Sequence, residues 1–312
     1  MKYCFGVDIG GTTVKMGLFE LEGKIVDKWE IPTRTENEGE AVLPDIAKSI
    51  EEKIQSMNIN KEDIKGIGIG VPAPVSEDGI VPNTANLGWG YKEVTREAEE
   101  LTGLPVKTGN DANVAALGEM WLGAGKGQKN MIMVTLGTGV GGGVIVDGKA
   151  VAGSTGAAGE IGHLCVNYEE TESCGCGNHG CLEQYASATG IARMAKRTLA
   201  KTKEETVLRG KSFVSAKDVF DAAKEGDKIA LQIVEEVCDI LALGLSYIAC
   251  VCDPEAFIIG GGVSKAGSIL TDTVQRLYVD NVFGELKKTK FVLATLGNDA
   301  GIYGGAKLAL GE

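Results

Sequence analysis

The sequence predicts an α/β protein made of two similarly built halves with a cleft between them. Two glycine-rich turns carry this prediction, DIGGT from Asp8 and LGTGVGGG from Leu136, because each stands between two strand-like runs. Helical patterns follow in both halves, so the repeated unit is of α/β type and is no short-period repeat. The length of 312 residues also suits about two domains.

The first half alternates strands with helices. Its strands end at glycine turns, and its first helix has isoleucines at helical spacing after Pro44 and Asp45, which act as a start signal. The run KGIGIGVP is typical of a buried strand interrupted by glycines. The expected elements are strands at 4–10, 14–20, 24–31, 65–72 and 104–109, and helices at 46–57, 94–101 and 112–123.

The second half restarts the cycle with a strand, a glycine turn and a strand. Its most apolar stretch, ILALGLSYIACVC, has 13 uncharged residues, which is too short for a bilayer and predicts a buried helix. The expected elements are strands at 131–137, 143–149, 256–262 and 291–297, and helices at 184–200, 228–250 and 299–310.

Composition excludes several classes of protein. A net charge of -12 argues against binding to duplex DNA, which needs clustered lysine and arginine. The start MKYCFGVDIGG lacks the apolar stretch of a signal peptide. We therefore expect a cytoplasmic protein with no nucleic-acid or membrane partner, in which the eight cysteines stay reduced.

Three glycine-rich turns follow predicted strands: DIGGTTVK, LGTGVGGG and IIGGGVS. Such glycines let consecutive N–H groups point at an anion, although a plain hairpin turn explains any one of them alone. The Walker pattern is absent, and residues 137–142 satisfy G-x-G-x-x-G without the helix that a dinucleotide site needs next. Three turns in one chain favour phosphate binding, and the context excludes a dehydrogenase.

Polar side chains near these turns are candidates for acid–base chemistry. Asp111 follows a predicted strand and stands at the N-terminus of the next helix. A carboxylate at a helix N-terminus is stabilised in its ionised form. It could act as a general base, or Asp111 or Asn113 could simply cap the helix. Glu160 and His163 share one face of a helical turn. The alternatives are a solvated Glu160 and a core-packed His163, and the uncharged surroundings argue against a solvated face.

Cys174, Cys176 and Cys181 have the spacing C-x-C-x4-C, which favours a soft metal ion such as zinc. Three sulfurs need a fourth ligand, and the candidates are the only two histidines, His163 and His179. A thioredoxin-type redox site needs C-x-x-C, which this cluster lacks. A closed sphere of four protein ligands leaves no position for water, so the metal would be structural.

DIGGTTVK resembles the first phosphate motif of the sugar-kinase, actin and Hsp70 superfamily, LGTGVGGG the second, and IIGGGVS the adenosine motif. Together with GNDAN, GEIGH and CGCGNHGCLE, they closely resemble the ROK family (repressors, open reading frames, kinases) over essentially the whole chain, its glucokinases in particular. The resemblance implies a two-lobed actin-like ATPase fold, a duplicated ribonuclease H-like fold with an interlobe cleft. Residues 1–118 and 299–312 would form a small lobe, and residues 119–298 a large lobe.

The resemblance also implies an ATP-dependent phosphorylation of a hexose, glucose first, at its 6-hydroxyl, with Asp111 as the base. The sugar-binding residues would be Asn110, Asp111, Glu160, His163 and Glu183, and the zinc ligands would be His163, Cys174, Cys176 and Cys181. The residues for ATP, with Asp8 toward its Mg2+, would be Asp8, Gly10, Gly11, Thr12, Thr13, Lys15, Gly137, Thr138, Gly139, Gly141, Gly260, Gly261 and Gly262. Relatives are commonly dimers or tetramers, so we expect a homo-oligomer.

Two alternatives stay open. One is a kinase for another hexose, such as fructose, allose, N-acetylglucosamine or N-acetylmannosamine. Ala73 stands where many relatives have glycine in a sugar-facing loop, which bears on this choice. The other is a sugar-sensing regulator without catalysis, which predicts a DNA-binding domain or the loss of Asp111.

Overall fold

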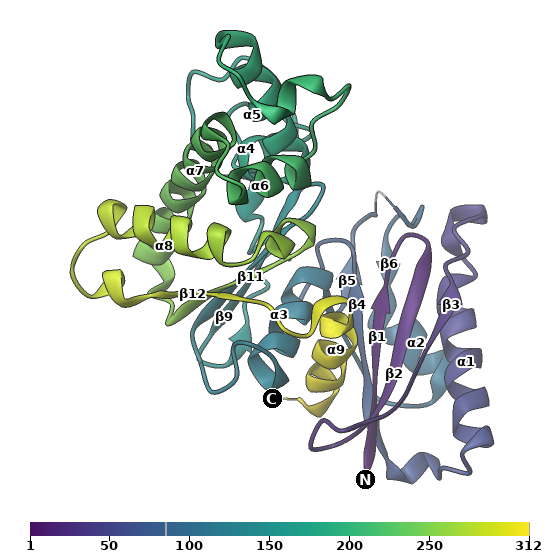
Figure 1. Ribbon diagram of the computed structural model, residues 1–312. Helices are drawn as coiled ribbons and strands as arrows, with labels where there is room; N and C mark the ends of the chain where they lie inside the picture. Colours follow the sequence, from purple (N-terminus) through teal and green to yellow (C-terminus); the bar gives the residue numbers. More distant parts are fainter. Residues whose placement is uncertain (85, 312) are drawn as a thin grey trace. The chain divides into compact units, whose positions relative to one another are not determined.

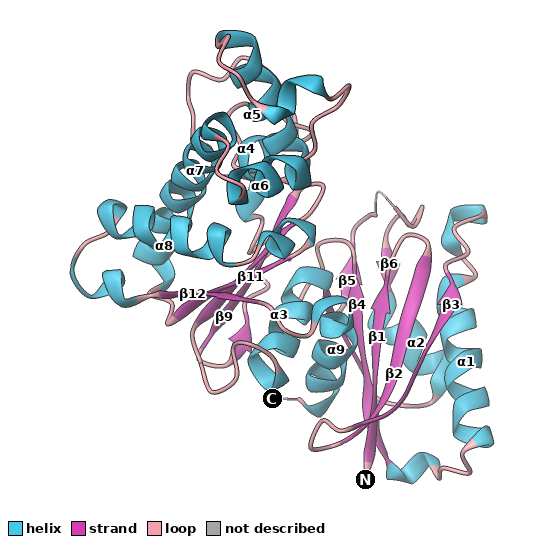
Figure 2. Cartoon of the chain, viewed as in Figure 1, coloured by secondary structure: helices cyan, strands magenta, loops and turns pink. Residues whose placement is uncertain are grey.

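The computed structural model describes residues 1–84 and 86–311, and it has the mixed α/β composition that the sequence predicts (Figure 2). Backbone contacts divide the chain into two units. The first contains Met1–Lys129, Gly143–Gly159 and Thr295–Glu312, and the second contains Asn130–Gly142 and Glu160–Ala294. The lobe boundaries expected at 118/119 and 298/299 remain a prediction.

The first unit is built on a five-stranded sheet of order β3-β2-β1-β4-β7 (Figure 1). β1 and β2 form an antiparallel hairpin, and β1 also pairs in parallel with β4. The strands are β1 (Tyr3–Ile9), β2 (Thr13–Glu20), β3 (Ile25–Pro32), β4 (Ile64–Val71) and β7 (Val106–Asn110), with a separate small pair β5 (Ile80–Val81) and β6 (Lys92–Glu93). The helices are α1 (Val42–Ser56), α2 (Val94–Thr102), α3 (Asp111–Leu122) and α9 (Ala300–Leu310).

Alternation along β1 assigns its side chains to two faces of this sheet. Phe5 and Val7 pack in a core with α1 and α2, whereas Cys4 packs with Ile302 and other residues of α9. Asp8 lies on the α9 face, because it follows Cys4 at an even spacing. The sheet therefore presents one carboxylate to the helix that ends the chain.

Close packing of α9 on the sheet depends on glycine. A Cβ added to Gly6 would lie 1.8 Å from the carbonyl oxygen of Ile302, so no side chain fits there without moving the helix. We expect Gly6→Ala to lower the free energy of unfolding by about 3 kcal/mol, the cost of overpacking a core. Gly210→Ala is the matched control, because its Cβ would meet nothing within 4 Å. Equal denaturant midpoints for the two variants would contradict this close approach.

The second sheet has the order β10-β9-β8-β11-β12. β11 pairs in parallel with both β8 and β12, so a β8–β9 turn beside a parallel strand repeats the β1–β2 and β4 arrangement of the first sheet. Its strands are β8 (Met131–Leu136), β9 (Val140–Val146), β10 (Lys149–Ala150), β11 (Ala256–Gly260) and β12 (Lys290–Leu293). The helices of the second unit are α4 (Glu183–Ala186), α5 (Ala188–Lys201), α6 (Ala216–Lys224), α7 (Lys228–Cys252) and α8 (Ser268–Asn281). Short 3-10 helices are η1 (Asn37–Gly39), η2 (Lys61–Asp63), η3 (Ile161–His163), η4 (Val207–Gly210), η5 (Gly262–Ala266), η6 (Gly284–Lys288) and η7 (Gly297–Asp299).

Two helix predictions are wrong in detail. The single helix expected at 184–200 is broken at Ser187, whose extended backbone (ψ 166°) ends α4 and whose hydroxyl accepts from the N–H of Gly190 to cap α5. The apolar helix expected to be buried is α7, but its residues Tyr247 and Val251 are 46% and 85% exposed. Within the described residues, no helix is long and apolar enough to cross a membrane.

Candidate functional site

The first glycine turn joins β1 to β2 and is held by its own backbone. The N–H of Gly10 donates to the carbonyl of Thr13 at 3.0 Å. Thr33, directly after β3, stabilises the turn. Its hydroxyl donates to the Gly10 carbonyl at 2.7 Å, and its N–H donates to the Thr12 carbonyl. Gly11 and Thr12 are exposed, so the tip of the turn is open to a ligand.

Asp8 and Lys15 are cross-strand partners directly behind this turn. Burial raises the pKa of Asp8, and the positive charge of Lys15 opposes that rise. A Cβ on Gly301 would lie 2.5 Å from Cγ of Asp8, so the carboxylate lies against the first turn of α9. A carboxylate held beside an open glycine turn suits a hydrated cation, which favours the ionised form of the carboxylate.

The second glycine turn joins β8 to β9, and the N–H of Gly137 donates to the carbonyl of Gly139 at 3.0 Å. The turn is followed by strand β9 and not by the helix that a dinucleotide-binding site needs, as the sequence predicts. The start of α5 is fastened to it, because the N–H of Ala188 donates to the Gly137 carbonyl and the hydroxyl of Thr189 to the Thr138 carbonyl, both at 2.8 Å.

The third glycine turn lies between β11 and η5. Gly261 has a φ of 83°, and a Cβ there would lie 2.5 Å from the carbonyl oxygen of Leu136, so only glycine fits. Beside it is a mostly apolar cavity of about 300 Å3. The cavity is lined by Ala188, Ser215, Ala216, Lys217, Phe220, Asp221, Gly262, Val263, Lys265 and Ala266.

Sequence reasoning missed α6, which supplies half of this cavity. The signal was present as Ser215-x-x-Asp218, a capping box. The Ser215 hydroxyl accepts from the N–H of Asp218, and the Asp218 carboxylate accepts from the N–H of Ser215. The expected helices pass from 184–200 to 228–250 and leave out this segment. A search for cap signatures, in addition to apolar periodicity, would have found this part of the site.

Asn110 and Asp111 lie at the junction of β7 and α3. The cap of α3 is Asn110, whose Oδ1 accepts from the N–H groups of Ala112 and Asn113. The alternative in which Asp111 or Asn113 caps the helix is therefore wrong. The amide of Asn110 also donates to Oδ1 of Asp111 and to the carbonyl of Ala73, each at 3.1 Å. These bonds orient the Asp111 carboxylate at the positive end of the helix.

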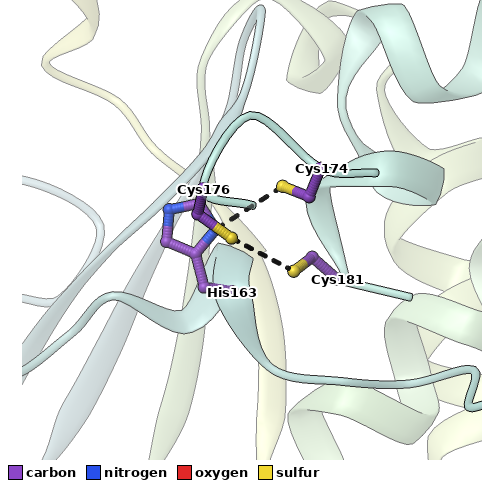
Figure 3. A group of neighbouring side chains, drawn as sticks. All are labelled: His163, Cys174, Cys176 and Cys181. Carbon is purple, nitrogen blue, oxygen red and sulfur yellow. Dashed lines mark hydrogen bonds between the residues drawn. The ribbon is translucent and has the colours of Figure 1, made fainter. Parts of the chain in front are cut away.

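His163 and three cysteines converge in the second unit (Figure 3). One ligand atom from each of His163, Cys174, Cys176 and Cys181 lies within 4.8 Å of all the others. The sulfurs of Cys176 and Cys181 are 3.7 Å apart, close to the ~3.8 Å that two Zn–S bonds of 2.3 Å require in a tetrahedron. The donor set and its spacing therefore fit zinc.

Backbone pairing brings the remote histidine to the cysteines. Val166 donates to the carbonyl of Gly180, and Leu182 donates to that of Leu164, both at 2.8 Å, so the chain after His163 runs antiparallel to the chain around Cys181. His179, the alternative ligand, contacts Ser173 at 3.2 Å instead and lies outside the cluster.

Glu183 links this cluster to the second glycine turn. Its Oε1 accepts from the thiol of Cys174 at 3.0 Å and lies 3.9 Å from Nδ1 of His163. A Cβ on Gly139 would lie 2.6 Å from its Oε2, so glycine in the turn makes room for the carboxylate. Glu160, before η3, and His163 are both exposed, which corrects the expectation against a solvated face.

An ion pair with a buried carboxylate joins the loop just before Cys174 to α5. The side chain of Glu170 is 3% exposed and accepts from both ends of the Arg197 guanidinium, at 2.7 and 3.0 Å. Tyr185 donates to the same carboxylate at 2.7 Å. The Arg197 hydrogen bond holds the pKa of Glu170 well below its usual range, so the pair stays charged at neutral pH.

Two glycine turns on five-stranded sheets of similar arrangement, with a third glycine turn beside a mostly apolar cavity, are the features of the actin-like ATPase fold. The chain belongs to the ROK family, whose sequence profile matches residues 4–312. It is 43% identical to a glucokinase of Halalkalibacterium halodurans over 98% of this chain and 94% of that one.

Solved structures agree. A ROK family glucokinase from Streptomyces griseus, in complex with glucose and AMPPNP, matches with a TM-score of 0.74 and 34% identity, covering 99% of this chain and 100% of that one. A ROK hexokinase from Thermus thermophilus matches with a TM-score of 0.80 and 29% identity over 98% and 97%. The two-lobed actin-like fold expected from the sequence is thereby confirmed.

Proposed function

We propose that this protein is an ATP-dependent hexokinase that phosphorylates glucose at its 6-hydroxyl. The observation that carries the proposal is 43% identity to a glucokinase over nearly the whole of both chains. The open glycine turns and the oriented Asp111 are parts that such a reaction needs, and the cysteine cluster lies beside Glu183, one of the proposed sugar-binding residues.

ATP would bind through the three glycine turns. Backbone N–H groups of the first two turns, with the Thr12, Thr13 and Thr138 hydroxyls, would cradle the phosphates. Asp8 would hold Mg2+, which neutralises charge on the transferred phosphoryl group, and Lys15 lies beside it. The base would enter the cavity beside Gly262, where Phe220 and Val263 offer apolar surface.

Asp111 would accept the proton of the sugar 6-hydroxyl as that oxygen attacks phosphorus. Phosphoryl transfer needs mainly positioning, cation charge and one proton acceptor. Asn110 would hold Asp111 in place. Its side-chain NH2 donates to the Asp111 carboxylate, and its side-chain oxygen caps α3. The other sugar hydroxyls would bind Asn110, Glu160, His163 and Glu183.

Zinc would be structural and would shape the sugar site. The four ligands close its coordination sphere, so the metal supplies stability and orientation. His163 would bind zinc through Nδ1 and leave its other ring nitrogen for the sugar, and Glu183 lies beside the cluster. Zinc would thus fix two of the proposed sugar-binding side chains.

A coupled assay of ADP release, run with purified protein across a panel of hexoses, tests the proposal. The panel holds glucose, fructose, allose, N-acetylglucosamine and N-acetylmannosamine, and we expect kcat/KM to be highest for glucose. A higher value for another sugar would reassign the substrate within the family. The absence of turnover with every sugar would overturn the kinase and favour a sugar-sensing regulator. Light scattering tests the proposed homodimer or homotetramer.

A further inference from the structure

Glu119 is a fully buried acid that the proposed mechanism does not use. It lies in α3 with 0% of its surface exposed. Its carboxylate accepts from three backbone N–H groups: that of Ala124 at 2.8 Å, that of Thr295 at 3.0 Å and that of Leu296 at 2.8 Å. A Cβ on Gly123 would lie 2.0 Å from Oε2 of Glu119, so the absence of a side chain at Gly123 leaves room for the carboxylate.

Thr295 and Leu296 belong to the connection that leads from β12 into η7 and α9. The far end of this connection is held by two lysines of the first sheet. Lys15 donates to the carbonyl of Asn298 at 3.0 Å, and Lys28 pairs with Asp299 at 2.6 Å. The connection is therefore anchored by Glu119 at its beginning and by β2 and β3 at its end.

The same connection determines where α9 begins. Gly301, in the first turn of α9, lies against the Asp8 carboxylate, and Lys15 is the cross-strand partner of Asp8. A displaced connection would move the positive end of α9 away from Asp8 and release Lys15 from the Asn298 carbonyl. Glu119, Asp8 and Lys15 are thus joined through one short segment of chain within the first unit.

We propose that Glu119 is a positioning residue for the magnesium nucleotide, acting on Asp8 and Lys15 through residues 295–301. The proposal rests on the proposed function, because it takes Asp8 as the residue that holds Mg2+. A carboxylate suits this anchor because it only accepts hydrogen bonds and all three backbone partners donate. Glutamine keeps the shape but turns one acceptor into a donor that faces N–H groups.

The test compares Glu119→Gln with Ile54→Ala, which removes buried apolar contacts from α1 in the same unit. For Glu119→Gln we expect the KM for Mg–ATP and the Mg2+ concentration at half-saturation to rise about tenfold, as one buried hydrogen bond is lost. The KM for the sugar should stay within about twofold. Ile54→Ala should lower stability and leave all three constants within about twofold.

Amide hydrogen exchange and equilibrium binding of Mg–AMPPNP provide readouts that need no sugar. We expect faster exchange at Thr295 and Leu296 in Glu119→Gln, together with weaker nucleotide binding. Unchanged exchange, unchanged nucleotide binding, or equal kinetic effects in the two variants would overturn the positioning role. If the wild-type protein phosphorylates no sugar, the proposed function fails, whereas exchange and nucleotide binding still decide the role of Glu119.

Discussion

Asp111→Asn should lower kcat for glucose by about 10²–10⁴-fold, the usual contribution of a positioned general base. Asparagine has the same shape and keeps an oxygen for the N–H of Ala112, which donates to Asp111 at 2.8 Å. It cannot take up the proton of the attacking hydroxyl. The KM for glucose and the KM for ATP should therefore change by no more than a few-fold. Steady-state kinetics with the coupled assay measure all three constants.

Asp272→Asn is the matched control for this loss. Asp272 is an exposed carboxylate on α8, so the same chemical change there should leave kcat unaltered. Thermal unfolding of both variants checks that α3 is intact. If Asp111→Asn keeps turnover within a few-fold of the wild-type protein, Asp111 is not the base.

Removal of zinc should raise the KM for the sugar by about 10–100-fold, a range typical of losing groups that orient a site. His163 would lose its ligand bond, and the pairing of residues 164–166 with 180–182 would hold Glu183 less firmly. The cavity proposed for the base of ATP is formed by α6, η5 and Ala188, none of which contributes a cysteine to the cluster. The KM for ATP should change much less.

Chelator-treated protein and Cys181→Ser test this separation, with metal content measured alongside both KM values. Cys250→Ser is the control, because Cys250 is exposed and lies outside the cluster. We expect one equivalent of zinc in the control and none in Cys181→Ser. A zinc-free protein that keeps its KM for the sugar would break the proposed link between the metal and Glu183.

Local patterns predicted most of the fold because they report local geometry. β1 and β2 were visible as apolar runs on either side of DIGGT, since a hairpin needs only neighbouring residues to form. The break at Ser187 was missed, because the helical pattern continues on both sides and only the backbone at that residue departs from it. The exposed face of α7 was also missed. An uncharged sequence does not show which face of the helix packs against other elements and which face is left in solvent.

The sequence by itself determined the glycine turns, the C-x-C-x4-C spacing and the position of Asp111 between a strand and a helix. Each of these features depends on residues a few positions apart, so the residue types and their spacing are enough to find it. Only the tertiary structure decided that His163 joins the cysteines, that Asn110 caps α3 beside Asp111, and that Glu119 anchors the segment before α9. The physical reason is that these contacts join segments remote in sequence, and strand pairing and burial select the partner from several chemically equivalent ones.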